Sequence, residues 1–256
     1  MPASPAARHY HEPMLQSGNP EDARAGSSGV RRVAFFGGSF DPPHRGHIAI
    51  ARAAQTALHL DTVLFAPVGA QPLKPQGATA GFEDRLAMTR LAIAGEPNFA
   101  VSLADAPSIN SSPNYTIDTL RTLRTELSAS SALFCLMGAD SFLTLHRWHR
   151  GADIPFVAPL IVASRPGQSL GELAGVLPAG LTLDRESNQS AGPVELRTYT
   201  LRNSVGVTAP FYLLPGLNID ISASAIRQQV RAAHVQPDSD LPPAVFDYIA
   251  SHGLYR

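Results

Sequence analysis

A short apolar run that ends at two glycines is the feature of this sequence that most constrains the fold. Residues 33–36 read Val-Ala-Phe-Phe, and Gly37 and Gly38 follow at once. An unbroken apolar run of this length is typical of a parallel strand that is buried on both faces. Glycine has no Cβ, so the chain can turn sharply there and a ligand can approach the backbone. Pro42 and Pro43 then exclude helix from the loop that follows.

A helix is predicted directly after this loop, from Gly46 to about His59. Its apolar face consists of Ile48, Ile50, Ala51, Ala54 and Leu58. The first turn of a helix offers unpaired N–H groups and a partial positive charge to an anion. His44 and His47 stand at this start, and imidazoles donate hydrogen bonds to phosphate oxygens. The segment therefore predicts a phosphate site. No cysteine or carboxylate cluster accompanies the histidines, so we expect no metal site among the protein side chains.

The rest of the chain alternates between strand and helix patterns. Strands are predicted at 62–67, 99–103, 133–137, 156–163 and 211–214. Helices are predicted at 83–94, 115–127, from about 138–141 onward, 222–233 and 244–251. This alternation predicts an α/β fold with a doubly wound parallel sheet and right-handed crossovers. In such sheets, ligands lie beyond the carboxyl ends of the strands, where the glycine turn falls.

The organisation of the chain follows from composition and rhythm. Residues 1–29 are rich in Pro, Ala, Ser and Gly and lack apolar periodicity, so we expect a mobile N-terminal tail. Residues 30–256 are predicted to form a single domain. Within it, about 165–210 breaks the alternation and is interpreted as an insertion whose role the sequence does not disclose. Residues from about 222 to 256 are expected to form a C-terminal helical part.

Composition excludes several classes of function. A net charge of −1 argues against a broad nucleic-acid surface, so phosphate recognition must come from local donors. No apolar run reaches membrane-spanning length, and no signal-peptide core is present, so we expect no membrane partner. The single cysteine, Cys135, excludes an internal disulfide and is in keeping with a cytoplasmic protein. The oligomeric state stays open, with a homo-oligomer among the alternatives.

The first motif resembles a known signature. The sequence Gly37-Gly38-Ser39-Phe40-Asp41-Pro42 followed by His-x-Gly-His is similar to the H-x-G-H signature of the nucleotidyltransferase superfamily, in its adenylyltransferase version. Ser39 stands where this group usually has Thr, and it keeps the hydroxyl. The resemblance implies a Rossmann-like nucleotidyltransferase fold, with catalytic contacts from both histidines to ATP phosphates. It assigns to the ATP site Gly37, Gly38, Ser39, Phe40, His44 and His47.

A second motif covers residues 221–227 (Ile-Ser-Ala-Ser-Ala-Ile-Arg). On its own, a serine-capped helix that carries an arginine is usually structural. Together with H-x-G-H it resembles the I-S-x-T-x-x-R motif of the same superfamily, which grips the β- and γ-phosphates of ATP. The resemblance adds to the ATP site Ile221, Ser222, Ser224 and the catalytic Arg227. Ser224 stands where the family has Thr.

Other segments resemble nicotinate mononucleotide adenylyltransferases. Residues 71–75 are similar to their P-P-H-K loop, with Leu73 in place of His and with Lys74 kept. Residues 112–120 resemble their S-x-Y-T segment, which implies that Tyr115 and Thr116 meet the pyridine substituent. Each of these two segments has an alternative interpretation. Lys74 could be an ordinary solvated lysine, and Thr116 could serve only as a helix cap.

The later part of the chain continues this resemblance. Gly138-Ala139-Asp140-Ser141 is similar to the family's G-x-D-s, which implies that Gly138 and Asp140 contact the nucleotide. Trp148 matches a tryptophan that stacks on the pyridine, although an indole in a hydrophobic core is an alternative. Arg165 matches the arginine of an R-P-G sequence near the nucleotide.

The implied reaction is adenylyl transfer from ATP to nicotinate mononucleotide, which gives nicotinate adenine dinucleotide and pyrophosphate in NAD biosynthesis. ATP would carry Mg²⁺. Nicotinamide mononucleotide or phosphopantetheine as acceptor and a catalytically silent nucleotide-binding module are the alternatives. A dehydrogenase is disfavoured because no G-x-G-x-x-G follows the first strand.

Overall fold

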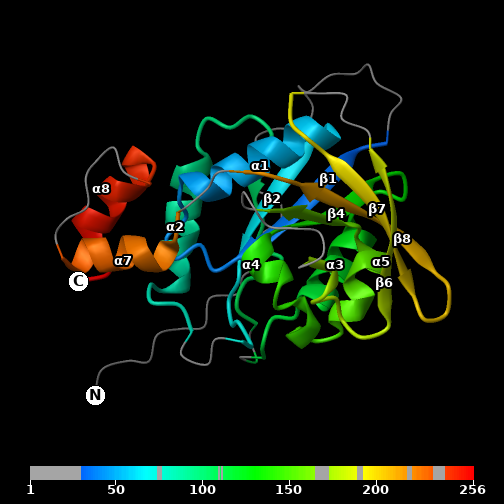
Figure 1. Cartoon of the computed structure of the whole chain (residues 1–256). Helices are drawn as coiled ribbons and strands as arrows, with labels where there is room; N and C mark the ends of the chain where they lie inside the picture. The colour runs from blue at the N-terminus through cyan, green and yellow to red at the C-terminus, as the bar shows by residue number, and fades with distance from the viewer. Residues whose placement is uncertain are drawn as a thin grey trace.

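The computed structural model describes residues 30–73, 77–108, 110, 112–164, 173–188, 193–217, 221–232 and 240–256. The predicted tail 1–29 and the start of the predicted insertion, 165–172, lie outside these residues. The strands are β1 (Arg32–Gly38), β2 (Thr62–Pro67), β3 (Phe99–Val101), β4 (Ala132–Gly138), β5 (Leu160–Ala163), β6 (Leu181–Asn188), β7 (Arg197–Asn203) and β8 (Thr208–Leu214). They form one sheet in the order β3-β2-β1-β4-β5-β8-β7-β6 (Figure 1).

The helices connect these strands and cover both faces of the sheet. They are α1 (Arg45–Leu58), α2 (Phe82–Ile93), α3 (Thr116–Glu126), α4 (Ala139–Phe142), α5 (Ile154–Val157), α7 (Ala223–Arg231) and α8 (Pro243–His252), with short 3-10 turns η2 (Leu145–Arg147) and η3 (Gly151–Asp153). None of the helices in the described part of the chain has both the length and the apolar character needed to cross a bilayer. Figure 1 shows α7 and α8 beside α2, at the end of the molecule opposite the β6–β8 strands.

The alternation of side chains along the strands separates two hydrophobic cores. In β1, Ala34 and Phe36 face the core that α1, α2, α7 and α8 cover, whereas Val33 and Phe35 face the core beneath α3, α4 and α5. Successive residues of a strand point to opposite faces of the sheet. Both sets of side chains are buried because helices cover both faces. The predicted burial of β1 on both faces is therefore confirmed.

Six neighbouring strands, from β3 to β8 in the sheet order, are parallel, which confirms the predicted doubly wound sheet. The chain runs outward from β1 through β2 to β3, and then returns to place β4 on the other side of β1. Such a reversal opens a crevice at the carboxyl ends of the two central strands. Gly37 and Gly38, where the sequence predicts a turn, are instead the last two residues of β1 and pair with Ala66 and Pro67 of β2, and they lie at this crevice.

One strand prediction in the second half of the chain was wrong. The expected strand 156–163 is a strand only from Leu160 onward, and α5 occupies Ile154–Val157, with Pro155 in its first turn. Within the predicted insertion, about 165–210, β6 and β7 form an antiparallel pair, and β7 also pairs antiparallel with β8. In β7, Tyr199 and Leu201 are buried while their neighbours are not, which is the period-two pattern of a strand.

A tight turn joins β7 to β8. The side chain of Asn203 accepts hydrogen bonds from the N–H groups of Val205 and Val207, at 3.2 and 2.8 Å. Gly206 has a φ of +87°, a conformation that glycine adopts without strain. The sheet therefore continues beyond its parallel part through β8 as an antiparallel meander.

Gly69 illustrates how closely the loops pack at the carboxyl edge. Its N–H donates to the carbonyl of Asp105 at 2.7 Å, and a Cβ added there would lie 2.4 Å from the backbone nitrogen of Pro107. Because backbone atoms cannot rotate away, we expect Gly69→Ala to lower the free energy of unfolding by about 2 kcal/mol or more. Urea unfolding measures this change.

Gly81→Ala is the matched control, because its added Cβ would meet only the Asp84 carboxylate, at an ordinary 3.4 Å. As a change at a helix N-cap, it should cost about 1 kcal/mol or less. Equal losses in the two variants would contradict the close approach at Gly69.

Candidate active site

A cavity of about 740 Å³ lies at the carboxyl ends of the central strands. It gathers most of the residues that the sequence motifs singled out, from the loop after β1, the starts of α1, α3, α4 and α7, and the turn after η2. The predicted site residues that line it are Gly37, Gly38, Ser39, Phe40, His44, His47, Tyr115, Thr116, Gly138, Asp140, Trp148, Ile221, Ser222, Ser224 and Arg227. Lys74 and Arg165 lie outside the described residues. The functional roles of all these residues stay predictions.

The two histidines stack on each other at the start of α1. Their ring centroids are 3.7 Å apart, and Phe40 packs against His47 at 5.0 Å. The backbone N–H of His44 donates to Nδ1 of His47 at 3.1 Å, so a neutral His47 carries its proton on Nε2. The buried Nδ1 of His44 has no partner among the described residues. The pair therefore retains imidazole nitrogens that can bind a ligand.

Burial keeps both imidazoles neutral at pH 7. It lowers the pKa of His44 to about 4. Burial also lowers the pKa of His47, and the positive charge that His44 would carry lowers it further. The free protein thus presents hydrogen-bond donors rather than cations. A triphosphate placed against these rings would raise both pKa values, because an anion favours the charged form of a neighbouring imidazole.

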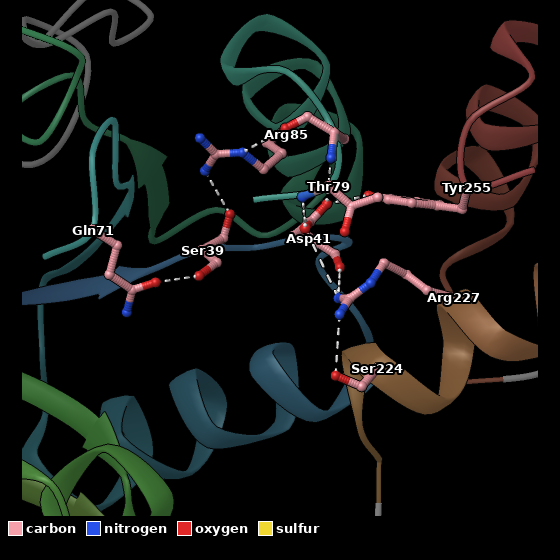
Figure 2. A network of polar contacts seen from close by, with 9 residues as sticks. Ser39, Asp41, Gln71, Thr79, Arg85, Ser224, Arg227 and Tyr255 are labelled. Atoms are coloured by element: carbon pink, nitrogen blue, oxygen red, sulfur yellow. Dashed lines mark hydrogen bonds and ion pairs between the residues drawn. The ribbon is translucent and has the colours of Figure 1, made fainter. Parts of the chain in front are cut away.

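Arg227 reaches the same region from the second turn of α7. Its Nη1 donates to the carbonyl of Asp41 at 2.6 Å, and its Nη2 donates to Oγ of Ser224 at 3.1 Å (Figure 2). Ser222 is the residue before α7, as predicted for an N-cap, but its side chain makes no capping hydrogen bond. The hydroxyl groups of Ser222 and Ser224 are exposed at the cavity, next to a helix N-terminus. This corner can bind an anion.

A buried arginine that was not predicted from the sequence, Arg85, forms hydrogen bonds to the loops after β1, after β2 and before α2. Arg85 of α2 is 2% exposed, and its guanidinium donates to the carbonyls of Ser39 at 2.7 Å, Val68 at 2.8 Å and Ala80 at 3.2 Å. Desolvation lowers its pKa from the usual arginine value, but the group stays charged at neutral pH. It therefore satisfies three loop carbonyls that would otherwise be buried without donors. An arginine within a helical sequence pattern usually lies on a solvated helix face, so no local signal marks Arg85 as buried.

Another part of the cavity lining, at the start of α3 and after η2, is aromatic. Tyr115 packs against His149 with ring centroids 4.4 Å apart, and Nε1 of Trp148 donates to the hydroxyl of Thr144 at 3.1 Å. Trp148 is half-buried: it lines the cavity and also packs on the core beneath α3. Tyr115 is the N-cap of α3, so the capping position expected for Thr116 is one residue earlier. A flat ring can bind at this end.

Asp105 is a buried acid at the cavity that the sequence did not single out. Its carboxylate accepts a hydrogen bond from the hydroxyl of Thr119, and its backbone carbonyl accepts one from Gly69. Burial raises the pKa of Asp105 to about 6. The same group helps to raise the pKa of the buried Cys135 thiol to about 12, so this cysteine is not a nucleophile.

Sequence comparison assigns the family. A family model described as cytidylyltransferase-like matches residues 35–229. The chain is similar to a probable nicotinate-nucleotide adenylyltransferase of Laribacter hongkongensis, with 39% identity over 88% of this chain and 94% of that protein. It is also similar to one of Stenotrophomonas maltophilia, with 40% identity over 87% of this chain and 96% of that protein. The chain belongs to this nicotinate-nucleotide adenylyltransferase family.

Structural comparison supports the fold. The chain is similar to the nicotinic acid mononucleotide adenylyltransferase of Plasmodium falciparum, solved as a complex with NaAD. The TM-score is 0.60 with 18% identity, over 88% of this chain and 97% of that chain. A second structure of that protein, complexed with APC, has a TM-score of 0.61. Family membership and the architecture of the parallel sheet are therefore in agreement.

The pKa of Asp105 makes a testable contribution to stability. Because the pKa is raised in the folded state from 3.8 to about 6, the folded protein binds more protons than the unfolded chain between these values. Stability from this group therefore falls as the pH rises from about 4 to 6. Asp105→Asn removes the titration and keeps an acceptor for Thr119. We expect its unfolding free energy, relative to wild type, to rise by up to about 3 kcal/mol between pH 4 and 7.

The measurement is urea unfolding of both proteins across this pH range. The titration of His44 has the opposite sign, since its pKa is lowered, but it is present in both proteins and cancels in the difference. A difference that does not change with pH would contradict the buried, titrating carboxyl.

Proposed function

We propose that this protein transfers the adenylyl group of ATP to nicotinate mononucleotide, giving nicotinate adenine dinucleotide and pyrophosphate in NAD biosynthesis. One observation carries the proposal: in a member of this family, one cavity is lined both by the two histidines with Arg227, here called the phosphate end, and by Tyr115 with Trp148, here called the aromatic end. A dinucleotide product needs both ends in one continuous space. The names of the relatives favour the acid over the amide as acceptor.

The phosphate end binds ATP. Gly37 and Gly38 at the end of β1, together with Ser39 and Phe40, form its floor, and His44 and His47 donate to the α- and β-phosphates. Arg227 and the exposed start of α7, with Ile221, Ser222 and Ser224, take the β- and γ-phosphates. Gly138 and Asp140 face the nucleotide sugar, beyond the end of β4. The neutral histidines suit this task because they donate hydrogen bonds to phosphate oxygens and hold no counter-ion that ATP would have to displace.

The aromatic end binds nicotinate mononucleotide. Trp148 stacks on the pyridine ring, and Tyr115 and Thr116 meet its carboxylate at the start of α3, where N–H groups are unpaired. Lys74 and Arg165, carried over from the family motifs, contact phosphate and nucleotide. The indole is held by its bond to Thr144, so it is oriented before the ligand arrives.

The chemistry is one in-line displacement. An oxygen of the mononucleotide phosphate attacks the α-phosphorus of ATP and forms the new P–O bond. The bond from the α-phosphorus to the oxygen bridging to the β-phosphorus breaks, and pyrophosphate leaves with that electron pair. The attacking phosphate is already ionised, so no general base is needed. The protein aligns two anions and stabilises charge on the leaving group, mainly through His47 and Arg227.

We propose Mg²⁺ as a companion of ATP rather than as a resident metal. Within the described ranges, no group of three His, Cys, Asp or Glu side chains is arranged to hold a metal ion. The buried Asp41 carboxylate accepts backbone and phenol hydrogen bonds instead. The residues present therefore fit an ion held by phosphate oxygens, where it offsets their charge.

A silent nucleotide-binding module is the second candidate function. Such a module would be expected to lose His44, His47, Lys74 or Arg227, and all four are present. We also propose a cytoplasmic location, in keeping with the one cysteine, which is free and buried. A homo-oligomer stays open.

Acceptor choice tests the proposed function. Pyrophosphate release is measured with ATP and Mg²⁺, offering nicotinate mononucleotide, nicotinamide mononucleotide and phosphopantetheine in parallel. We expect a strong preference for the first. Preference for nicotinamide mononucleotide would keep the ATP end and contradict the acid specificity, whereas no turnover with any acceptor would favour the silent module.

His47→Ala tests the phosphate end. Loss of a donor aimed at developing charge typically lowers kcat by about 10²–10³, and we expect a loss of this size. His146→Ala is the matched control, since this imidazole is exposed on η2 and does not line the cavity. Thermal unfolding checks that both variants are folded, and near-normal turnover by a folded His47→Ala would refute the role of His47.

A further inference from the structure

The carboxylate of Asp41 is buried at the edge of the cavity and is held from three directions. Its Oδ2 accepts the N–H of Thr79 at 2.6 Å, and its Oδ1 accepts the N–H of Ala80 at 3.1 Å. Its Oδ1 also accepts the hydroxyl of Tyr255 at 2.8 Å (Figure 2). Asp41 is only 5% exposed, so these donors replace water around the carboxylate.

The same residue also holds Arg227, through its backbone. The carbonyl of Asp41 accepts Nη1 of Arg227 at 2.6 Å, while its carboxylate oxygen Oδ2 is 3.9 Å from that nitrogen. The guanidinium is thus fixed by a neutral carbonyl and kept short of a close ion pair. Oγ of Ser224 accepts a hydrogen bond from the other terminal nitrogen of Arg227, Nη2.

Tyr255, near the other end of the sequence, donates the third hydrogen bond to the Asp41 carboxylate. It is the penultimate residue, 214 positions after Asp41, and it is 6% exposed with its ring in the core beside α1 and α8. Gly253 ends α8 with a φ of +62°, which turns the chain back toward the site. Burial and the Asp41 charge raise the pKa of the Tyr255 phenol, so the hydroxyl stays protonated and donates.

We propose that Tyr255 is a positioning residue for the ATP site, acting through Asp41 on Arg227. The proposal rests on the proposed function. With the phenol in place, the Asp41 carboxylate is satisfied and the guanidinium stays available to phosphate. Without it, one carboxylate oxygen loses a donor and the nearest cation is Arg227. The carboxylate then competes with the β- and γ-phosphates for the same guanidinium.

Tyr255→Phe tests this proposal, because it removes only the hydroxyl. The ring keeps its packing, and Asp41 keeps both backbone donors, so the variant is expected to fold. We expect KM for ATP to rise about tenfold, with KM for nicotinate mononucleotide unchanged. The inhibition constant of added pyrophosphate should rise by the same factor, because the leaving group occupies the same β,γ-site.

Tyr248→Phe is the matched control. Tyr248 lies on α8, and its hydroxyl also donates to a carboxylate oxygen, Oδ1 of Asp84, at 3.1 Å. This hydrogen bond is not part of the Asp41 network. We expect all kinetic constants of this variant to match wild type. A Tyr255→Phe enzyme with unchanged KM for ATP, or with equal changes for both substrates, would leave Tyr255 a purely structural residue and overturn the proposal.

The wild-type assay separates this outcome from failure of the proposed function. If wild type makes no dinucleotide, direct titration with a non-hydrolysable ATP analogue replaces kinetics. Tyr255→Phe should then bind the analogue about tenfold more weakly than Tyr248→Phe. Equal binding by the two variants would overturn the role of Tyr255 independently of the reaction.

Discussion

The buried carboxylate and carbonyl of Asp41 form the contact on which the geometry of the phosphate end depends. Through them the loop after β1 is joined to the loop before α2, to Arg227 of α7 and to Tyr255 near the C-terminus. None of these partners is close to Asp41 in sequence, so this corner forms only when the sheet and its helices have assembled. The loop that contains Asp41 also leads into His44 and His47 at the start of α1. Asp41 therefore links the position of the donors on α1 to that of Arg227 on α7.

The proposed phosphate end of the cavity presents few charged groups. Both histidines are neutral in the free protein because burial lowers their pKa values, and Arg85 uses its charge on loop carbonyls rather than on a ligand. Under the proposed function, the phosphates would therefore be bound mainly by oriented N–H groups and by Arg227. The proposal is thus compatible with the net charge of −1 of the chain. Preorganised donors in a partly dry cavity are stronger than the same groups in water.

The sequence was sufficient for the parts of the fold that rest on local patterns. The apolar run of β1 and the amphipathic α1 each have a short-range signal, and the parallel pairing of the strands follows from their alternation with helices. The β6–β7 pairing was missed because its pattern is short and punctuated by Gly and Pro. Arg85 and Tyr255 were missed because their partners are distant in sequence, and no local pattern marks a phenol that binds a carboxylate 214 positions away.

A crystal structure with bound nicotinate adenine dinucleotide would test the central claim, that one cavity holds both halves of the reaction, most directly. We expect the pyridine ring to stack on Trp148. We also expect the adenylyl phosphate within hydrogen-bond distance of His44 or His47, and Arg227 still bound to the Asp41 carbonyl. A pyridine ring at the α7 end, or phosphates away from the start of α1, would contradict it.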